Sequence, residues 1–577
     1  MKGLADDLRV KTWLALAVLA LALAALATFP AILQTATHVG APIDHPDTTV
    51  GIWWPTVVAE SLVAGESPFF CSQLNWPEGQ DTRLVLWSFT LEALFLPVAL
   101  LFEPIEAMNV MLFCILVLNG LACAWAGRVV SGSWLGAVVG LVFGATSAYS
   151  FCESSFGRPQ QALWAPLVVY LGGLVLLARE PGSWRGRAIC IGSLAASATI
   201  YWFYGYFLGV LTILLAVGHG VTRTMTRAKF LDFAVVGVGG VLLSAPFMVP
   251  VIQGYLENPQ HYEGVAQDHA DPLMLQMSHA FTFPGSYLGA LSENFHEPSN
   301  RLPVVVVPLL LFGAWRGKGP VRWLAGLGLA AALLAAGPEL LSAPSVPLRL
   351  GDRMGVRLPQ ALLNHLPGWP RFWWPYRWQA VSYGAAAMVA AWAVPRLPRP
   401  RWVAGAFALL QASEANLILR GGLRAPHQMQ SPAQVPEIFH ALARLEGERP
   451  ILQAPLATHP NSLLGWQIYH RQPIDGGVAW QMSGVRTEGY DQRRVQVPLW
   501  VDLQRIWHGE EAYRPAREPW TLEDSGGYHY VMMYPNREIE HDLRAIDATT
   551  AYLGEPFWDG PMVVLWALDG VAEVPQL

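Results

Sequence analysis

The feature that most constrains this fold is a series of apolar segments between residues 12 and 419. Most are about as long as the 17–25 residues that a helix needs to cross a bilayer. Only 14% of the residues are charged, where a soluble domain carries about 25%. The segments lie near 12–33, 107–126, 133–150, 161–178, 188–203, 205–221, 230–252, 302–315, 322–341, 376–394 and 401–419. The sequence therefore predicts a mainly α, polytopic transmembrane bundle of about 11–13 membrane helices.

Basic residues set the expected topology, because loops rich in Lys and Arg stay on the cytoplasmic side. Basic clusters occur at 179–187, 223–229, 316–322 and 396–401. With these clusters and the N-terminus inside, segment 84–102 cannot be a simple crossing, so we expect it to be re-entrant or interfacial. The alternative is that a short span, such as 188–203 or 205–221, does not cross. The expected external loops are 34–106, 151–160, 253–301 and 342–375.

The chain changes character from about residue 420 onward, where apolar runs shorten and charged residues return. Short strands are predicted at 450–455, 528–534 and 562–567, and amphipathic helices at 436–445 and 537–552. We therefore divide the chain into a transmembrane domain, 1–419, and a small extracytoplasmic α/β domain, 420–577.

Two cysteines, Cys71 and Cys152, fall in the expected external loops, where the compartment is oxidising. They are predicted either to form a disulfide or to remain two buried thiols, and their spacing does not decide between these alternatives.

Several classes of function lose support from the sequence. The net charge of -6 gives no basic field for nucleic acid, so we expect no nucleic-acid partner. There is no phosphate-binding glycine loop, no His-Glu-x-x-His and no Gly-x-Ser-x-Gly. Mid-span charges of the kind that mark a translocation path are few, which disfavours a transporter or flippase, although this alternative stays open.

The first external loop carries the ionisable residues of greatest interest. Asp44 and Asp47 precede an aromatic pair, Trp53 and Trp54, and a short helix is expected from Thr56. Carboxylates at the bilayer edge are costly unless they are used. The alternative is a solvated turn, because Asp and Pro are common turn residues.

Short motifs in a fixed order resemble GT-C-type membrane glycosyltransferases, and more closely a bacterial branch related to YfhO-type proteins. The matching segments are Asp47 with Trp53 and Trp54, Gly65–Phe69, Trp76–Gly79, Leu366–Trp378, Ile451–Pro455 and His470–Gly477. The Gly-Asp pair that is usual in the family is absent, since Asp47 follows Pro46. Asp44 therefore remains a competing candidate for the conserved acid of the motif.

The resemblance implies transfer of a sugar from a polyprenyl-phosphate carrier to a glycan, lipid or protein acceptor on the external face of the bacterial inner membrane. A carboxylate then deprotonates or positions the acceptor hydroxyl, and cations stabilise the leaving lipid phosphate. Asp47 is the first candidate for the base and Asp44 the second. A non-catalytic envelope-assembly protein with a degenerate site is a further alternative.

Arginines suit the lipid phosphate, because the guanidinium donates two parallel hydrogen bonds. The candidates are Arg158, Arg371 and Arg377, and the alternatives are a surface ion pair for Arg158 and interfacial anchoring for the other two. For the sugar or acceptor we select Trp53, Trp54, Glu153 and His279.

No cofactor is firmly indicated. Acids and histidines in loop 253–301 could hold a divalent metal, but they lack a tight ligand spacing, and a solvated lid is the alternative.

Overall fold

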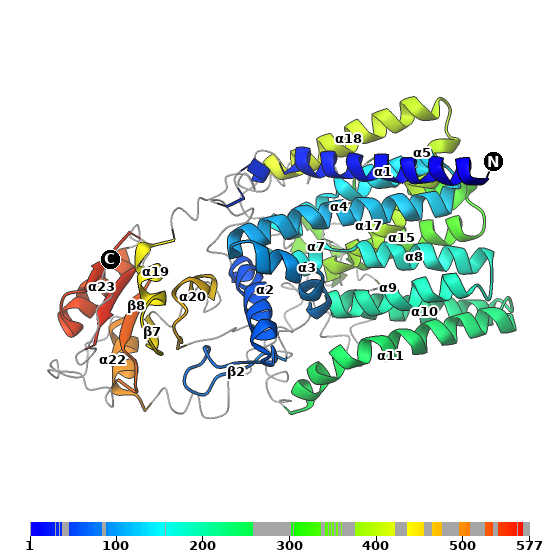
Figure 1. The fold of residues 1–577 in the computed structure, drawn as a ribbon. Helices are drawn as coiled ribbons and strands as arrows, with labels where there is room; N and C mark the ends of the chain where they lie inside the picture. The colour runs from blue at the N-terminus through cyan, green and yellow to red at the C-terminus, as the bar shows by residue number, and fades with distance from the viewer. Residues whose placement is uncertain are drawn as a thin grey trace.

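The computed structural model describes most of the chain. The described residues are 2–28, 31–33, 35–36, 46–83, 88–155, 157–257, 302–303, 305–335, 341–343, 346–347, 349–350, 354–355, 359, 375–421, 435–454, 464–475, 496–507, 525–534, 540–561 and 563–568. The fold is mainly helical, with a bundle of long helices at one end and a small sheet near the C-terminus (Figure 1).

The bundle is built from helices whose apolar segments the hydropathy pattern predicts. They are α1 (Lys2–Ala27), α4 (Pro104–Ser131), α5 (Trp134–Ala145), α6 (Ala148–Ser155), α7 (Pro159–Ala162), α8 (Ala165–Arg179), α9 (Trp184–Ile200), α10 (Trp202–Val221), α11 (Arg227–Glu257), α14 (Val306–Arg316), α15 (Pro320–Ala335), α17 (Gln379–Ala393) and α18 (Pro400–Gly421). Short 3-10 turns lie at η1 (Ala31–Leu33), η3 (Pro375–Trp378) and η4 (Val394–Arg396).

Within the described residues, six helical stretches are long and apolar enough to cross a membrane. They are Val10–Ala27, Pro104–Ser131, Trp134–Ser154, Pro159–Arg179, Trp202–Val221 and Arg227–Gly254. Shorter apolar helices accompany them at Thr90–Leu101, Val306–Arg316 and Pro320–Ala335. The chain is therefore a membrane protein, while the number of crossings and their sidedness stay predictions.

Close contact between backbones holds α4 against α5. A Cβ on Gly140 would lie 2.3 Å from the carbonyl oxygen of Cys123, and one on Gly144 would lie 2.4 Å from that of Asn119. Small residues let membrane helices approach closely, and dispersion contacts between them replace the hydrophobic driving force that lipid removes. Gly140 and Gly144 thus set how closely α4 and α5 pack.

Helix α17 lies inside the bundle, packed against α4, α5, α8, α14 and α15. Its sequence is rich in alanine, and almost every residue from Gln379 to Ala393 is buried. Side chains of this size allow five helices to pack around one. The turn that precedes α17, η3, is thereby carried to the end of the bundle with Arg377.

Helix α2 (Pro46–Ala64) lies across the end of the bundle, between it and the C-terminal sheet (Figure 1). The sequence predicted a short helix only from Thr56. That start was wrong, because the helix begins at Pro46 and holds Pro55 in its interior, with Gly51 four residues earlier. Asp47 is therefore part of the helix rather than of a preceding loop.

A small hairpin and a short helix follow α2. The hairpin pairs β1 (Phe70–Cys71) with β2 (Gln80–Asp81), antiparallel. Helix α3 (Phe89–Leu101) has 13 residues and contains Pro97. At a rise of about 1.5 Å per residue it spans about 20 Å, less than the hydrocarbon core of about 30 Å. Whether 84–102 makes a simple crossing stays a prediction.

The C-terminal region contains a four-stranded sheet in the order β7-β8-β10-β9. Strands β7 (Ile451–Ala454) and β8 (Tyr530–Met533) are parallel, while β10 (Val564–Ala567) pairs antiparallel with β8 and with β9 (Trp558–Asp559). The helices around it are α19 (Glu437–Ala443), α20 (Leu464–His470), α22 (Pro498–Trp507) and α23 (Glu540–Leu553). Three predicted strands and both predicted helices are confirmed, whereas α20, α22 and β9 were not predicted.

Further two-stranded pairs follow α15 and precede α17 in the chain. They are β3 (Leu341–Ala343) with β4 (Val346–Pro347), and β5 (Arg349–Leu350) with β6 (Met354–Gly355). All five cysteines carry thiols, so Cys71 and Cys152 follow the second of the two alternatives, burial without a disulfide. Burial raises the pKa of the Cys71 thiol to about 11.

Candidate active site

The N-terminus of α2 positions Asp47 at the end of the bundle. Proline suits the first turn of a helix, because its φ is already helical and its missing N–H would have no partner there. Asp47 follows in that first turn, where the positive end of the helix dipole stabilises a carboxylate. Its side chain is 8% exposed, and Thr48 and Thr49 beside it are buried.

A glycine brings a second segment onto this turn. Gly157 has φ +70, and a Cβ there would lie 2.3 Å from the Cα of Thr48. From the other side, a Cβ on Gly51 would lie 2.5 Å from the carbonyl oxygen of Gly157. Two glycines thus let the turn after α6 touch the backbone of α2. The next residue, Arg158, is thereby delivered to Asp47.

Arg158 bridges two carboxylates. Its Nε donates to Oδ2 of Asp47 at 2.5 Å, and its Nη1 lies 3.5 Å from Oε2 of Glu153. The side chains of Arg158, Asp47 and Glu153 are 12%, 8% and 1% exposed. An ion pair this deeply buried differs from the solvated surface pair that was the alternative for Arg158 and Glu153.

A second arginine lies near this cluster. Arg377 is 1% exposed, and its guanidinium carbon lies 4.3 Å from the ring centroid of Phe203 and 5.2 Å from that of Tyr201. The charges of Arg377, Glu153, Arg158 and Asp47 all act electrostatically on Tyr201. The interaction of the guanidinium with aromatic faces is favourable where water is excluded. Arg377 therefore lies against Tyr201 and Phe203, and the charges of the Arg158 cluster act on the same tyrosine.

Buried hydrogen bonds connect the helices that carry the cluster. The hydroxyl of Tyr204 donates to the carbonyl of Gln161 at 2.5 Å and lies 2.9 Å from the hydroxyl of Tyr149. Ser150 accepts from Trp164 Nε1 at 2.6 Å. These bonds join α6, α7, α8 and α10 beneath the turn that carries Arg158, and satisfied buried networks of this kind rigidify a site.

Trp53 connects α2 to the C-terminal region. Its ring is fully buried, and Nε1 donates to Oε1 of Gln467 in α20 at 2.9 Å. Gln467 in turn donates to Oε1 of Gln73 at 2.5 Å. Trp54 is 3% exposed. Trp53 thus joins two parts of the fold, and the selection of Trp53 and Trp54 for the sugar or acceptor stays a prediction.

The loop after α2 also contacts the C-terminal region. Ile474 N donates to Gln73 O at 2.9 Å, and Trp76 N donates to Ile474 O at 3.2 Å. The ring of Trp76 lies 5.4 Å from that of Tyr528, whose hydroxyl donates to the Trp76 carbonyl. The segment 65–83 is thus held between the bundle and the sheet.

The structure therefore brings together four of the residues selected from the sequence, Asp47, Arg158, Glu153 and Arg377. Asp44, Arg371 and His279 lie outside the described residues, and their roles stay predictions. Tyr201 and Phe203 were missed, because in the sequence they look like ordinary residues at a span boundary.

Glu92 in α3 was also missed as a candidate group. It is 4% exposed and accepts from the Ser88 hydroxyl at 2.9 Å. Its only signal in the sequence is an acid within an apolar segment.

A metal site stays a prediction. In the part of the chain that the structure describes, no three His, Cys, Asp or Glu side chains gather as a metal ion requires. The candidates for a divalent cation lie in loop 253–301, most of which is outside that part.

Comparisons with known proteins place the fold. The chain matches no protein-family model, and no curated protein sequence is similar to it. Its structure is similar to that of ArnT from Cupriavidus metallidurans bound to undecaprenyl phosphate, with TM-score 0.55 and 14% identity over 97% of this chain and 99% of that one. The fold is GT-C-like.

A second similar structure is the oligosaccharyltransferase AglB from Archaeoglobus fulgidus, in complex with an inhibitory peptide and a dolichol-phosphate. The TM-score is 0.50 and the identity 10%, over 94% of this chain and 71% of that one. Both neighbours are GT-C glycosyltransferases. At these identities the likeness concerns the fold, and the chemistry has to be argued from this chain's own residues.

Proposed function

We propose that this protein is a membrane glycosyltransferase that moves a sugar from a polyprenyl-phosphate donor to an acceptor hydroxyl. The observation that carries the proposal is the buried contact of Asp47 with Arg158 at the end of a GT-C-like bundle. The undecaprenyl phosphate bound to ArnT and the dolichol-phosphate bound to AglB support a lipid-linked donor.

In the proposed reaction, a carboxylate oxygen of Asp47 takes the proton of the acceptor hydroxyl. The acceptor oxygen forms a bond to the anomeric carbon of the sugar, on the face opposite the phosphate. The bond from that carbon to the phosphate oxygen breaks, and its electron pair leaves with the lipid phosphate. A positioned base contributes about 10²–10⁴-fold to such a rate.

Arg158 serves two purposes in this proposal. Without donor it holds the Asp47 carboxylate in one orientation through Nε. With donor bound, the same guanidinium supplies a cation for the phosphate, whose charge grows as the bond breaks. Arg377 adds a second positive charge from behind Tyr201 and Phe203.

The finer assignments are also proposals. The order of the short motifs favours the bacterial branch related to YfhO-type proteins, and hence the inner membrane with the Asp47 end facing outward. The acceptor is a glycan, a lipid or a protein.

The test is turnover of reconstituted protein with polyprenyl-phosphate sugars and a panel of acceptors. Asp47→Asn is expected to lower turnover about 100-fold or more, because the amide cannot take a proton. Glu60→Gln, on the same helix but with its side chain 57% exposed, is the matched control and keeps wild-type turnover.

Equal turnover of Asp47→Asn and wild type would overturn the assignment of the base. If Asp44→Asn alone abolished turnover, the base would be Asp44. No effect from either change would remove both acids as the base, and an absence of turnover in the wild type would favour the assembly-protein alternative.

A further inference from the structure

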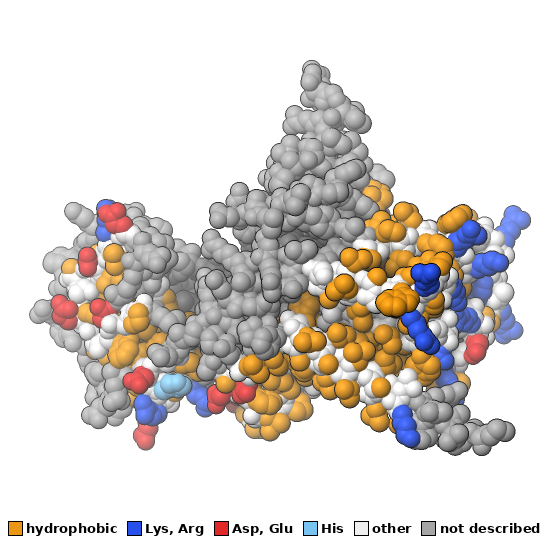
Figure 2. Space-filling model, turned by 90° about the horizontal axis from the view of Figure 1, so that it is seen from above, with side chains coloured by type: hydrophobic (Ala, Val, Ile, Leu, Met, Phe, Trp, Pro, Cys, Tyr) orange, Lys and Arg blue, Asp and Glu red, His pale blue; other side chains and the backbone are white. Residues whose placement is uncertain are grey.

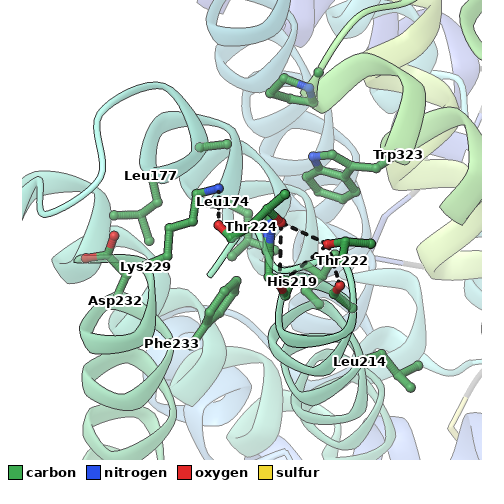
Figure 3. A pocket seen from close by; sticks show the side chains of 15 residues that line it. Leu174, Leu177, Leu214, His219, Thr222, Thr224, Lys229, Asp232, Phe233 and Trp323 are labelled. Atoms are coloured by element: carbon green, nitrogen blue, oxygen red, sulfur yellow. Dashed lines mark hydrogen bonds between the residues drawn. The ribbon is translucent and has the colours of Figure 1, made fainter. Parts of the chain in front are cut away.

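A groove lies among the ends of α8 and α10 and the starts of α11 and α15, with a volume of about 500 Å³ (Figure 3). It is far from Asp47, because α10 begins beside Tyr201 and ends at the groove. Helix α10 has 20 residues, so at about 1.5 Å per residue its Tyr201 end and the groove are about 30 Å apart, the thickness of a bilayer core. The groove therefore belongs to the opposite end of the bundle.

One side of the groove is polar. Lys229 Nζ donates to the carbonyl oxygen of Thr224 at 3.2 Å, and His219 Nδ1 lies 2.7 Å from the hydroxyl of Thr224. The hydroxyl of Thr222 lies 2.9 Å from that of Thr224. Figure 3 shows these side chains converging from α10, α11 and the turn between them. An ammonium, an imidazole and two hydroxyls are groups that bind phosphate oxygens.

The acid in the lining of the groove, Asp232, already has partners. Asp232 accepts from Arg187 Nε at 2.7 Å and from the backbone N–H of Gly182 at 3.0 Å. Across the described residues, no carboxylate lies within ion-pair distance of Lys229. The Lys229 ammonium is therefore a positive charge that an anionic ligand can pair with.

The remaining walls are apolar. Leu174 and Leu177 of α8, Leu214 of α10, Phe233 of α11 and Trp323 of α15 line them. Leu214 is 62% exposed, and the described bundle surface that Figure 2 shows is largely hydrophobic. Such walls fit acyl chains that enter from the side.

More cations surround the opening. Arg223, Arg227, Lys318 and Arg322 are exposed and lie within two residues of the lining. Glu180, at the end of α8, is an exposed acid in the same region. Lys and Arg gather at this end of the bundle in Figure 2. The rim is therefore positively charged.

We propose that this groove binds one anionic phospholipid of the bilayer. The phosphate lies against Lys229, His219 and the hydroxyls of Thr222 and Thr224, and the acyl chains follow the apolar walls. Basic pockets between membrane helices recognise anionic headgroups in this way. The site is separate from the Asp47 cluster and does not depend on the proposed transferase reaction.

The test is native mass spectrometry of the full chain in detergent, with dioleoyl phosphatidylglycerol or dioleoyl phosphatidylcholine added. Wild type is expected to retain phosphatidylglycerol more strongly than phosphatidylcholine. Lys229→Glu is expected to weaken phosphatidylglycerol binding about fivefold or more, and Lys229→Gln less. Arg401→Glu, an exposed cation in a different basic cluster, is the matched control and keeps wild-type binding.

Three results would overturn the proposal. The first is equal weakening by Lys229→Glu and Arg401→Glu, which would indicate general attraction to a basic surface. The second is binding unaffected by Lys229→Gln and Lys229→Glu. The third is displacement of the lipid by millimolar glycerol phosphate, which would assign the site to a soluble phosphate. Melting temperatures without lipid show that each variant is folded.

Discussion

Arg158 Nε lies 2.5 Å from Asp47 Oδ2, although 111 residues separate the two in the chain. Arg158 follows the turn after α6, and Asp47 lies in the first turn of α2. Neither element could place its residue alone, because the contact depends on the backbone approach at Gly157. The candidate site is therefore a property of the packing of α2 on the bundle.

Replacing Arg158 by Gln is expected to lower the free energy of unfolding by about 3 kcal/mol, because two buried carboxylates lose their shared cation. The double variant Arg158→Gln with Asp47→Asn is expected to be more stable than the sum of the single losses predicts. Chemical denaturation in detergent measures the three variants as a double-mutant cycle. Additive losses would contradict a buried interaction between the two side chains.

Replacing Gly157 by Ala tests the close approach. Its positive φ costs an alanine about 1–2 kcal/mol, and the new Cβ also meets the backbone of Thr48. We expect a lower melting temperature together with lower turnover, because Arg158 is displaced. Gly132→Ala is the matched control, since Gly132 has φ +72 but no described atom within 4 Å of its Cβ position. The Gly132→Ala variant should lose only the stability that the positive φ costs an alanine.

Replacing Trp53 by Phe removes the donor to Gln467 but keeps a large aromatic ring. The expected loss is about 1 kcal/mol, with faster hydrogen exchange in α20, because α20 is held to α2 through this bond. Trp54→Phe is the control, since Trp54 Nε1 makes no hydrogen bond within the described part of the chain. Equal exchange rates in α20 for the two variants would argue against the joining role of Trp53.

Because His470 is buried, the free energy of unfolding is expected to depend on pH. Burial lowers the pKa of its imidazole to about 3, so the folded protein resists protonation. The unfolded chain binds that proton below a pKa of about 6.5, so this contribution is complete above pH 6.5 and is lost as the pH falls toward 3.

The expected slope from His470 is about 1.4 kcal/mol per pH unit within that window. His470→Asn keeps an acceptor for the Gln472 N–H, which bonds to Nδ1 of His470 at 3.2 Å, but it cannot be protonated. Unfolding measured at pH 7 and at pH 4.5 should show a smaller acid loss in the variant. An unchanged acid loss would mean that His470 is not the titrating group.

Hydropathy was enough to predict the bundle, because long apolar segments have few alternatives to helices in a bilayer. The strands at 451–454, 530–533 and 564–567 were also predictable from short apolar runs between turn residues. The start of α2 was missed, because its first turns are fixed by packing against Gly157, a contact that the local sequence does not show.

The candidate site was predicted as separate residues rather than as a constellation. Asp47, Glu153, Arg158 and Arg377 drew attention as charges near apolar spans. Their grouping depends on tertiary packing, and so do the rings of Tyr201 and Phe203 around Arg377. The hydrogen bond from Trp53 to Gln467 joins residues 414 positions apart, and no local sequence pattern predicts it.

The bond from Trp53 to Gln467 has a practical consequence for work with shortened chains. A protein cut after Gly421 would lose α20 and leave one face of the helix that carries Asp47 uncovered. Trp53 would then present its indole N–H and an apolar ring to water. The C-terminal region is thus not a detachable accessory, and the helical part should be studied with it attached.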